Sequence, residues 1–447
     1  MCRQLSYRSP CSYNKNSYKL NLCSVEDLVL MLVLASLILI VTYILIAWEI
    51  IPKVTAAMLG ASVMLLIGHI PASRAFSHID FAVIFLLIGM MIIVNITSRS
   101  GVFNWLGIVI LKRTFGEPKL ILLSLAILTA FLSAFLDNVT TVVLMLPIIY
   151  NVTARLNINP IPFLTTIILA SNIGGTATLI GDPPNILIGT AANLSFMDFL
   201  TELTPVITII LIAALGVLLI YYRRDLRSKP EYRVLLSDIS IQGVITDFPL
   251  MFRSLTVLFI VILGFMLHGV LHIDAYVFAL FGASLLLLGE RPKQIMNEVE
   301  WTTIFFFIGL FIIIGGFAEA GGIQMLSRAV LDLTHGNLQA TTFLVLWASG
   351  LFSAVIDNIP FTITMIPMIQ DMHGVMNLTP LWWSLSLGAC LGGNATLVGA
   401  AANVIVSESS IHNGYKIHFF DFLKIGVMIT TLSLAISSIY LYFRFFF

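Results

Sequence analysis

The chain is poor in charged residues. Only 10% of its 447 residues are Asp, Glu, Lys or Arg, whereas 59% are hydrophobic, and soluble domains carry about 25% charged residues. The 23 basic and 23 acidic residues cancel, and no basic patch is interleaved with aromatic residues, which argues against a nucleic-acid partner. This composition excludes a soluble domain and predicts a multi-pass protein of the cell membrane, in contact with membrane lipid.

Cysteine is scarce, and the motifs of several enzyme classes are absent. The four cysteines, at positions 2, 11, 23 and 390, form no Cys-x-x-Cys pair, so neither a zinc site nor a disulfide framework is predicted. No Gly-x-x-x-x-Gly-Lys run is present to hold ATP phosphates, so ATP could drive this chain only through a separate soluble ATPase subunit. The chain also lacks a His/Glu metal motif and a nucleophile–base pair, so we expect no enzyme activity and no cofactor other than a coupling proton or Na⁺.

Long apolar runs dominate the rest of the chain. A run of about 20 residues can cross roughly 30 Å of hydrocarbon. Such runs lie at 28–49, 53–71, 80–98, 161–180 and 203–222, and again at 252–271, 274–289, 301–318, 381–399 and 421–443. Segments 119–150 and 339–370 each hold two apolar arms split by Asp-Asn, which favours a re-entrant helical hairpin. The short amphipathic segments 101–116 and 321–335 are expected along the membrane interface.

Short polar stretches, which we call polar islands, interrupt these apolar segments, and they occur twice. Asp137-Asn138 is followed 220 positions later by Asp357-Asn358, and Gly174-Gly175 is followed 218 positions later by Gly392-Gly393. Each half holds five spans and one hairpin, and an odd number of crossings gives the two halves opposite orientations. The predicted fold is therefore an all-α membrane protein made of two inverted-topology repeats, each with a re-entrant hairpin and a broken helix, as in secondary transporters.

This repeat divides the chain into four parts. A polar N-terminal tail covers residues 1–27, the first transport repeat 28–222, a linker 223–251, and the second transport repeat 252–447. The linker carries five basic residues between Arg223 and Arg233, which predicts a cytoplasmic location because cytoplasmic loops are enriched in Lys and Arg.

Three aspartates in the islands are the strongest functional candidates. An ionised carboxylate in the middle of a span costs roughly 2.5–3.5 kcal/mol, so Asp137, Asp182 and Asp357 indicate an ion or substrate site. The alternative, that each carboxylate caps a broken helix, stays open. Asp182 has no acidic counterpart in the second half, where Ala400 stands. It is therefore the candidate proton-coupling group, and transport is expected to depend on pH.

The other polar residues of the islands complete the predicted site. Oxygen-rich sites suit hard cations such as sodium, for which Asn138, Asn358 and the carbonyls of the broken helices are candidate ligands. The glycine pairs lower helix propensity by about 1 kcal/mol per residue and favour unwinding, although glycine also permits close helix packing. The predicted substrate- and ion-binding residues are Asp137, Asn138, Thr140, Thr141, Gly174, Gly175, Thr176, Thr178, Asp182, Asn185, Asp357, Asn358, Thr362, Gly392, Gly393, Asn394, Thr396 and Asn403.

The islands resemble those of the ion-transporter superfamily. The run Thr-Leu-Ile-Gly-Asp-Pro-Pro-Asn at 178–185, together with the two Asp-Asn pairs, is similar to the group that contains arsenical-pump membrane proteins, NhaD-type sodium–proton antiporters and the melanosomal P protein, with a citrate-transporter-like domain. The resemblance covers residues 28–447. It implies a scaffold subdomain, a moving transport subdomain and a homodimer.

Electrostatics orders the candidate substrates. Acidic islands without a nearby base would repel citrate or another dicarboxylate, whereas a neutral solute such as arsenous acid, or a cation exchanged for protons, meets no such repulsion. The sequence therefore favours an ion-coupled secondary transporter of a small inorganic ion or small anion. A proton-coupled permease for arsenite or antimonite efflux comes first, a sodium–proton antiporter second, and a citrate or dicarboxylate carrier third. A channel is the rival from a different class.

Overall fold

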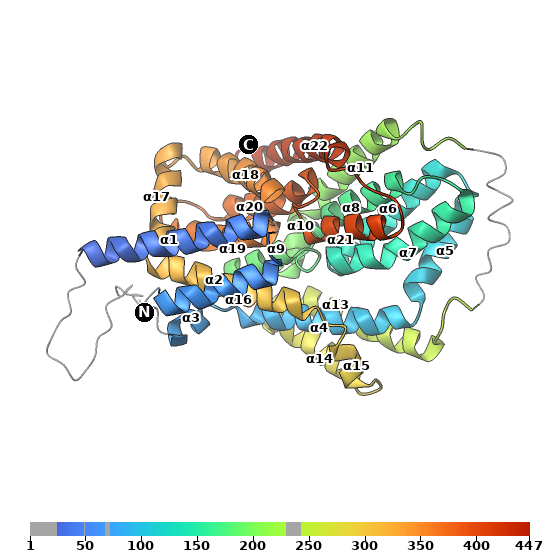
Figure 1. Cartoon of the computed structure of the whole chain (residues 1–447), viewed down its shortest axis with the longest axis horizontal. Coiled ribbons are helices and arrows are strands. Elements are labelled where there is room, and N and C mark those ends of the chain that lie inside the picture. Colours follow the sequence, from blue (N-terminus) through green and yellow to red (C-terminus); the bar gives the residue numbers. More distant parts are fainter. Residues whose placement is uncertain (1–24, 49, 68–71, 229–242) are drawn as a thin grey trace.

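The computed structural model describes residues 25–48, 50–67, 72–228 and 243–447. Most of the predicted N-terminal tail, including Cys2, Cys11 and Cys23, lies outside the described residues, as does 229–242 of the predicted linker. The described residues form helices joined by short turns, without a β-strand (Figure 1). In chain order the helices are α1 Val25–Ala47, α2 Lys53–Ile67, α3 Ala72–Ser77, α4 Phe81–Arg99, α5 Val102–Arg113, α6 Pro118–Phe135, α7 Asn138–Leu156, α8 Ile161–Gly175, α9 Pro183–Ala192, α10 Phe196–Glu202, α11 Thr204–Tyr221, α13 Phe248–Leu271, α14 Ala275–Leu287, α15 Pro292–Met296, α16 Trp301–Glu319, α17 Gly322–Thr334, α18 Leu338–Val355, α19 Asn358–Asp371, α20 Thr379–Gly392, the 3₁₀ turn η1 Gly393–Ala395, α21 Ala401–His412 and α22 Phe419–Phe445.

The lengths of these helices confirm the membrane class. Within the described ranges, nine helices are long and apolar enough to cross a bilayer, and α2, α8 and α14 are shorter apolar helices. In a bilayer, backbone N–H and C=O groups find no water, so a helix that satisfies them internally is one of the few structures that can span it. The protein is therefore an all-α, multi-pass membrane protein.

Two of the predicted spans are wrong at their C-terminal ends. The sequence predicts continuous spans over 161–180 and 381–399, but α8 ends at Gly175 and α20 ends at Gly392. The backbone after each glycine pair leaves the helix and is held by side-chain hydrogen bonds from asparagines further along the chain. The segments that follow are compact buried turns, which lead into α9 and α21.

The helices pack into two groups (Figure 1). We call α1, α2, α4, α13, α14 and α16 the first bundle, and α6 to α9, α11 and α18 to α22 the second bundle. Each bundle takes helices from both halves of the chain, because α2 packs on α16, α4 on α14, and α8 and α20 lie together. The candidate site lies where the two bundles meet.

Small residues allow helix backbones to approach closely in the first bundle. A Cβ on Gly309 of α16 would lie 2.8 Å from the backbone of Ala57 in α2, and a Cβ on Gly89 of α4 would lie 2.8 Å from the backbone of Ala279 in α14. Small residues at such crossings let helix backbones approach closely, which is how helices associate without a hydrophobic driving force. The contact of α2 with α16 and that of α14 with α4 thus occur at matching places in the two halves. The opposite orientation of the halves stays a prediction.

Cysteine labelling tests that orientation. Positions 116 and 336 mark matching hairpin entrances in the sequence, but Gly116 and Gly336 have φ values of 77° and 66°, which a cysteine adopts only with strain. Lys119 and Gln339 are exposed, helical and 220 positions apart, so Lys119→Cys and Gln339→Cys are better probes. We expect an impermeant thiol reagent to label them from opposite faces of sealed vesicles. Labelling of both from one face would contradict the inverted repeat.

Candidate functional site

The two Asp-Asn pairs meet at one cavity between the bundles. Its volume is about 480 Å³, and its wall includes Asp137, Asn138, Asp182, Asp357 and Asn358. Helices α7, α19 and α9 begin at or next to these residues, so three helix N-termini, with their partial positive charge, adjoin the same space. Segments far apart in the sequence thus form a single pocket, in which polar residues of the helix starts lie among apolar residues.

Helices α6 and α7 form one helical hairpin and α18 and α19 form the other, and each Asp-Asn pair stands at the tip of its hairpin. Asp182 lies between these two tips. Its side chain is fully buried, and one carboxylate oxygen accepts hydrogen bonds from Nδ2 of Asn138 at 3.3 Å and Nδ2 of Asn358 at 3.2 Å. Although Asp182 occupies the N-cap position of α9, its side chain makes no cap hydrogen bond. The capping alternative therefore does not describe the Asp182 carboxylate, which instead connects the tips of both hairpins.

Asp137 and Asp357 do act as helix caps. Asp137 accepts from the backbone N–H of Thr140 at 2.8 Å and also from the Thr140 hydroxyl. Asp357 accepts from the N–H of Ile359 at 3.2 Å. Both also line the cavity, so capping does not remove either carboxylate from the candidate site.

Two charged residues of the cavity were missed by the sequence analysis. Nζ of Lys53 lies 2.8 Å from Oδ2 of Asp357, although no base is near Asp357 in the sequence. Glu300 lines the same cavity beside Thr302 and Thr303. Burial, and then the charge of Asp137, raises the pKa of Glu300, against the hydrogen bond from Thr303, so this carboxyl keeps its proton to higher pH than a free glutamate. Lys53 and Glu300 lie at the starts of α2 and α16, and only the tertiary fold brings them close to the hairpin tips.

Asn185 and Asn403 hold the two helix breaks in shape. The Asn185 amide donates to the carbonyls of Thr176 and Thr178, at 3.1 and 2.8 Å. The Asn403 amide likewise donates to the carbonyls of Gly393 and Thr396, at 2.7 and 2.8 Å. Each of these carbonyls, predicted as cation ligands, thus accepts one amide hydrogen bond, and neither asparagine lines the cavity.

Two hydroxyls fasten the breaks to the hairpins. The Thr178 hydroxyl donates to the carbonyl of Ala134, and the Thr396 hydroxyl donates to that of Ala354 at 2.6 Å. Both acceptors lie near the ends of the first hairpin arms, α6 and α18. These threonines therefore couple each break to the hairpin of the same half, behind the cavity wall.

Asn172 is a buried residue that the sequence analysis missed. Its Nδ2 donates to Oδ1 of Asn394 at 3.0 Å and of Asn403 at 2.9 Å, while its Oδ1 accepts from Asn138 at 3.2 Å. The matching residue 218 positions later is Cys390, whose thiol lies 3.5 Å from Oδ1 of Asn185. Each of these two residues thus contacts the asparagine of the opposite half. An asparagine two residues before a glycine pair was the available signal.

The remaining predicted residues lie behind the cavity wall. Thr176 and Thr362 each donate to a backbone carbonyl of their own helix, at 2.7 Å. Within the described structure, Thr141 Oγ1 and Asn394 Nδ2 are buried without a hydrogen-bond partner. A Cβ on the predicted glycines would meet neighbouring backbone or side-chain atoms, so they serve close packing; these are Gly174, Gly175, Gly392 and Gly393.

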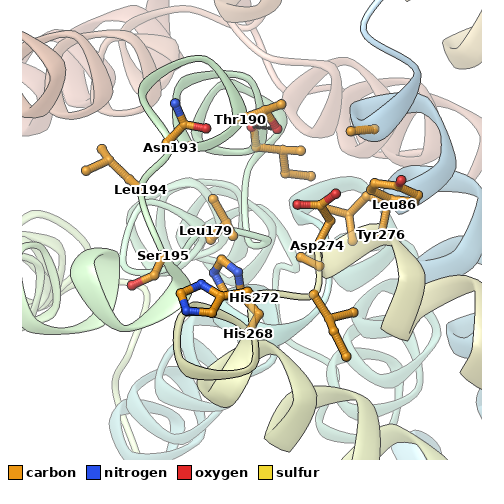
Figure 2. Close-up of a pocket in the computed structure, with 16 residues that line it drawn as sticks. Leu86, Leu179, Thr190, Asn193, Leu194, Ser195, His268, His272, Asp274 and Tyr276 are labelled. Atoms are coloured by element: carbon orange, nitrogen blue, oxygen red, sulfur yellow. Dashed lines mark hydrogen bonds between the residues drawn. The ribbon is translucent and has the colours of Figure 1, made fainter. Parts of the chain in front are cut away.

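A second cavity lies elsewhere between the bundles and contains none of the predicted site residues. It measures about 400 Å³, and Figure 2 shows His268 and His272 close together, with Asp274 facing the same space. Nε2 of His268 accepts from the N–H of Phe196 at 3.1 Å. Both histidines line this cavity, and His268 is half-buried while His272 is exposed.

Comparison with known proteins identifies the class to which this fold and cavity belong. The citrate transporter family model matches residues 43–388. The chain is 41% identical over 428 residues to an uncharacterised transporter of Mycobacterium bovis, with 93% of this chain and 99% of that protein covered. It is 40% identical over 425 residues to a 46 kDa membrane protein of Mycobacterium leprae, at the same coverage. It is also 31% identical over 496 residues to the human P protein, covering 91% of this chain and 59% of the P protein.

These matches define a secondary transporter of the ion-transporter superfamily. The chain belongs to the citrate transporter family.

Proposed function

We propose that this chain is a proton-coupled permease that exports arsenite or antimonite as the neutral hydroxide. The observation that supports this proposal is the Asp182 carboxylate, fully buried and bonded by the asparagines of both hairpin tips. A carboxyl group at that junction gains or loses a proton only with a change in the hydrogen bonds of both tips. Proton transfer and tip movement are then coupled.

The charges of the cavity support a substrate that is not an anion. Asp137, Asp182, Asp357 and Glu300 line it, and Lys53 is the basic residue in the wall. A polycarboxylate entering this space would meet like charges, whereas arsenous acid carries no charge and offers three hydroxyl donors to carboxylate and amide oxygens. Cys390 is buried outside the cavity wall, so we propose recognition by hydrogen bonds rather than by thiols.

Sodium–proton antiport is the second candidate. The excess of carboxyl groups over the single ammonium in the wall favours a cation, and oxygen ligands suit sodium. The predicted homodimer and a docked soluble ATPase subunit accompany either candidate and stay predictions.

Flux through purified protein separates the candidates. Proteoliposomes with an imposed pH gradient are supplied with arsenite, sodium or citrate. We expect arsenite to move against its own gradient when protons move the other way, with no requirement for sodium. Sodium flux driven by the pH gradient, without arsenite flux, would favour the second candidate. Citrate flux alone would contradict both.

Asn substitutions at the hairpin tips test the role of charge there. Asparagine caps helices about as well as aspartate, so Asp137→Asn and Asp357→Asn should keep the starts of α7 and α19 while removing one negative charge each. We expect each variant to be produced at near wild-type levels and to lose at least about tenfold in transport rate, which corresponds to about 1.4 kcal/mol. Full transport in both would rule out the tips as the coupling site.

A further inference from the structure

One ion pair joins the two bundles at the candidate site. Lys53 is the first residue of α2 in the first bundle, and its Nζ lies 2.8 Å from Oδ2 of Asp357 in the second bundle. The side chain of Asp357 is 3% exposed and that of Lys53 is 23% exposed. Because Oδ1 of Asp357 caps α19 through the N–H of Ile359, the ammonium is attached to the tip of the second hairpin.

A neighbouring contact holds the same hairpin arm. The hydroxyl of Tyr43, in α1, donates to the carbonyl of Pro360 at 2.7 Å and lies 2.6 Å from the hydroxyl of Thr364. Two successive helices of the first bundle thus bind the first turns of α19. A movement of α19 past the first bundle must break both contacts.

The second half of the chain has no lysine at the corresponding place. The backbone contacts pair Ala57 with Gly309 and Ala279 with Gly89, so α2 corresponds to α14 with an offset of 222 positions. The counterpart of Lys53 is then Ala275, which lines the second cavity next to Asp274. Asp137, the counterpart of Asp357, would meet no ammonium at that place.

We propose that Lys53 is a tethered cation that holds Asp357 in the present conformation, with the hairpin tips open to the 480 Å³ cavity, and that a coupling proton or Na⁺ displaces it. The proposal rests on the assignment to a secondary transporter and on no particular substrate. A cation bound at Asp357 neutralises the charge that attracts Lys53, so cation binding and separation of the bundles are linked. With Ala275 opposite, this contact stabilises one of two conformations.

Several carboxyl groups compete for the same cation. Asp137 and Asp182 face Asp357 from the starts of α7 and α9, and Glu300 faces it from the start of α16. Because Lys53 is already paired with Asp357, a cation that enters the cavity binds Asp357 only if Lys53 withdraws. Lys53 is thus a positioning residue, because the conformational change requires a cation to replace it at Asp357.

Cysteine labelling tests the proposal without measuring transport. The native cysteines are replaced by alanine, and Ile405→Cys places a thiol in the cavity wall. In purified protein, we expect Lys53→Met to slow the reaction of this thiol with a soluble maleimide by about threefold or more, as the open conformation loses population. Lys53→Arg should restore the wild-type rate. Lys424→Met is the matched control, because Lys424 pairs with Asp421 at an exposed surface position, and it should change nothing.

A double-mutant cycle completes the test. Asp357→Asn keeps a capping side chain and should slow labelling as Lys53→Met does. The combined variant should be no slower than either single variant, because both remove the same pair. Additive slowing, or unchanged labelling in Lys53→Met or Asp357→Asn, would overturn the proposal. A lack of arsenite flux would reject the proposed substrate and leave the labelling result standing.

Discussion

Asp182→Asn is expected to reduce transport by at least about 100-fold, a loss of roughly 2.7 kcal/mol. The Asp182 carboxylate accepts hydrogen bonds from the amides of Asn138 and Asn358. An asparagine in its place would have one acceptor oxygen and an NH₂ group that faces other donors. It also cannot bind and release a proton. The residual transport should therefore be independent of pH, while Asp182→Glu should retain a shifted pH dependence. Initial rates between pH 5 and pH 9 in proteoliposomes measure both effects.

Asp80→Asn provides the control for this substitution. Asp80 is the N-cap of α4, and its side chain accepts from the N–H groups of Ala82 and Val83 at 3.0 and 3.2 Å. Asparagine caps comparably, so this variant should transport at close to the wild-type rate. If Asp182→Asn also transported normally with an unchanged pH profile, the coupling group would have to be sought at Asp137 or Asp357.

Gly174→Ala is expected to have the largest effect on stability. A Cβ at Gly174 would fall well within contact distance of the Ala130 backbone in α6, and backbone atoms cannot move aside as a side chain can. Overpacking of this kind costs about 1–3 kcal/mol or more. We expect a lower unfolding temperature in detergent and a large loss of monodisperse protein on size-exclusion chromatography.

Gly216→Ala is the matched control for Gly174→Ala. Gly216 lies inside α11, and nothing is within 4 Å of the position that its Cβ would take. Alanine is the better helix former by about 1 kcal/mol, so this variant should be as stable as the wild type or slightly more stable. Equal unfolding temperatures for both variants would show that α8 and α6 can separate without cost.

The sequence was sufficient to predict the helical membrane class and the places where helices break. Those features depend on local composition: long apolar runs determine the spans, and the glycine pairs fall where α8 and α20 end. The ends of these spans were predicted too late because a hydropathy pattern cannot distinguish a buried turn from a helix. Leu179 and Ile180 are apolar and buried, yet they lie in the turn that follows α8.

The contacts of the site depend on the tertiary fold and could be predicted only in part. Asp182, Asn138 and Asn358 were each identified as polar residues in apolar surroundings, but the sequence gives no sign that one carboxylate accepts from both amides. Lys53 is separated from Asp357 by 304 positions, and a lysine at the start of a span is common at membrane surfaces. Its pairing depends on the packing of both α2 and α19 on α16, which no local pattern predicts.

The shared packing of the first bundle has a consequence for biosynthesis. Helix α2 is synthesised about 250 residues before α16, on which it packs, and α4 nearly 200 residues before α14. At 5–20 residues per second, the nascent chain inserts α2 on the order of ten to fifty seconds before its partner exists. During this interval the small-residue faces around Ala57 and Gly89 contact lipid or the insertion machinery. Two fragments divided between α11 and α13 should therefore each be unstable when expressed alone and should regain a stable fold when co-expressed.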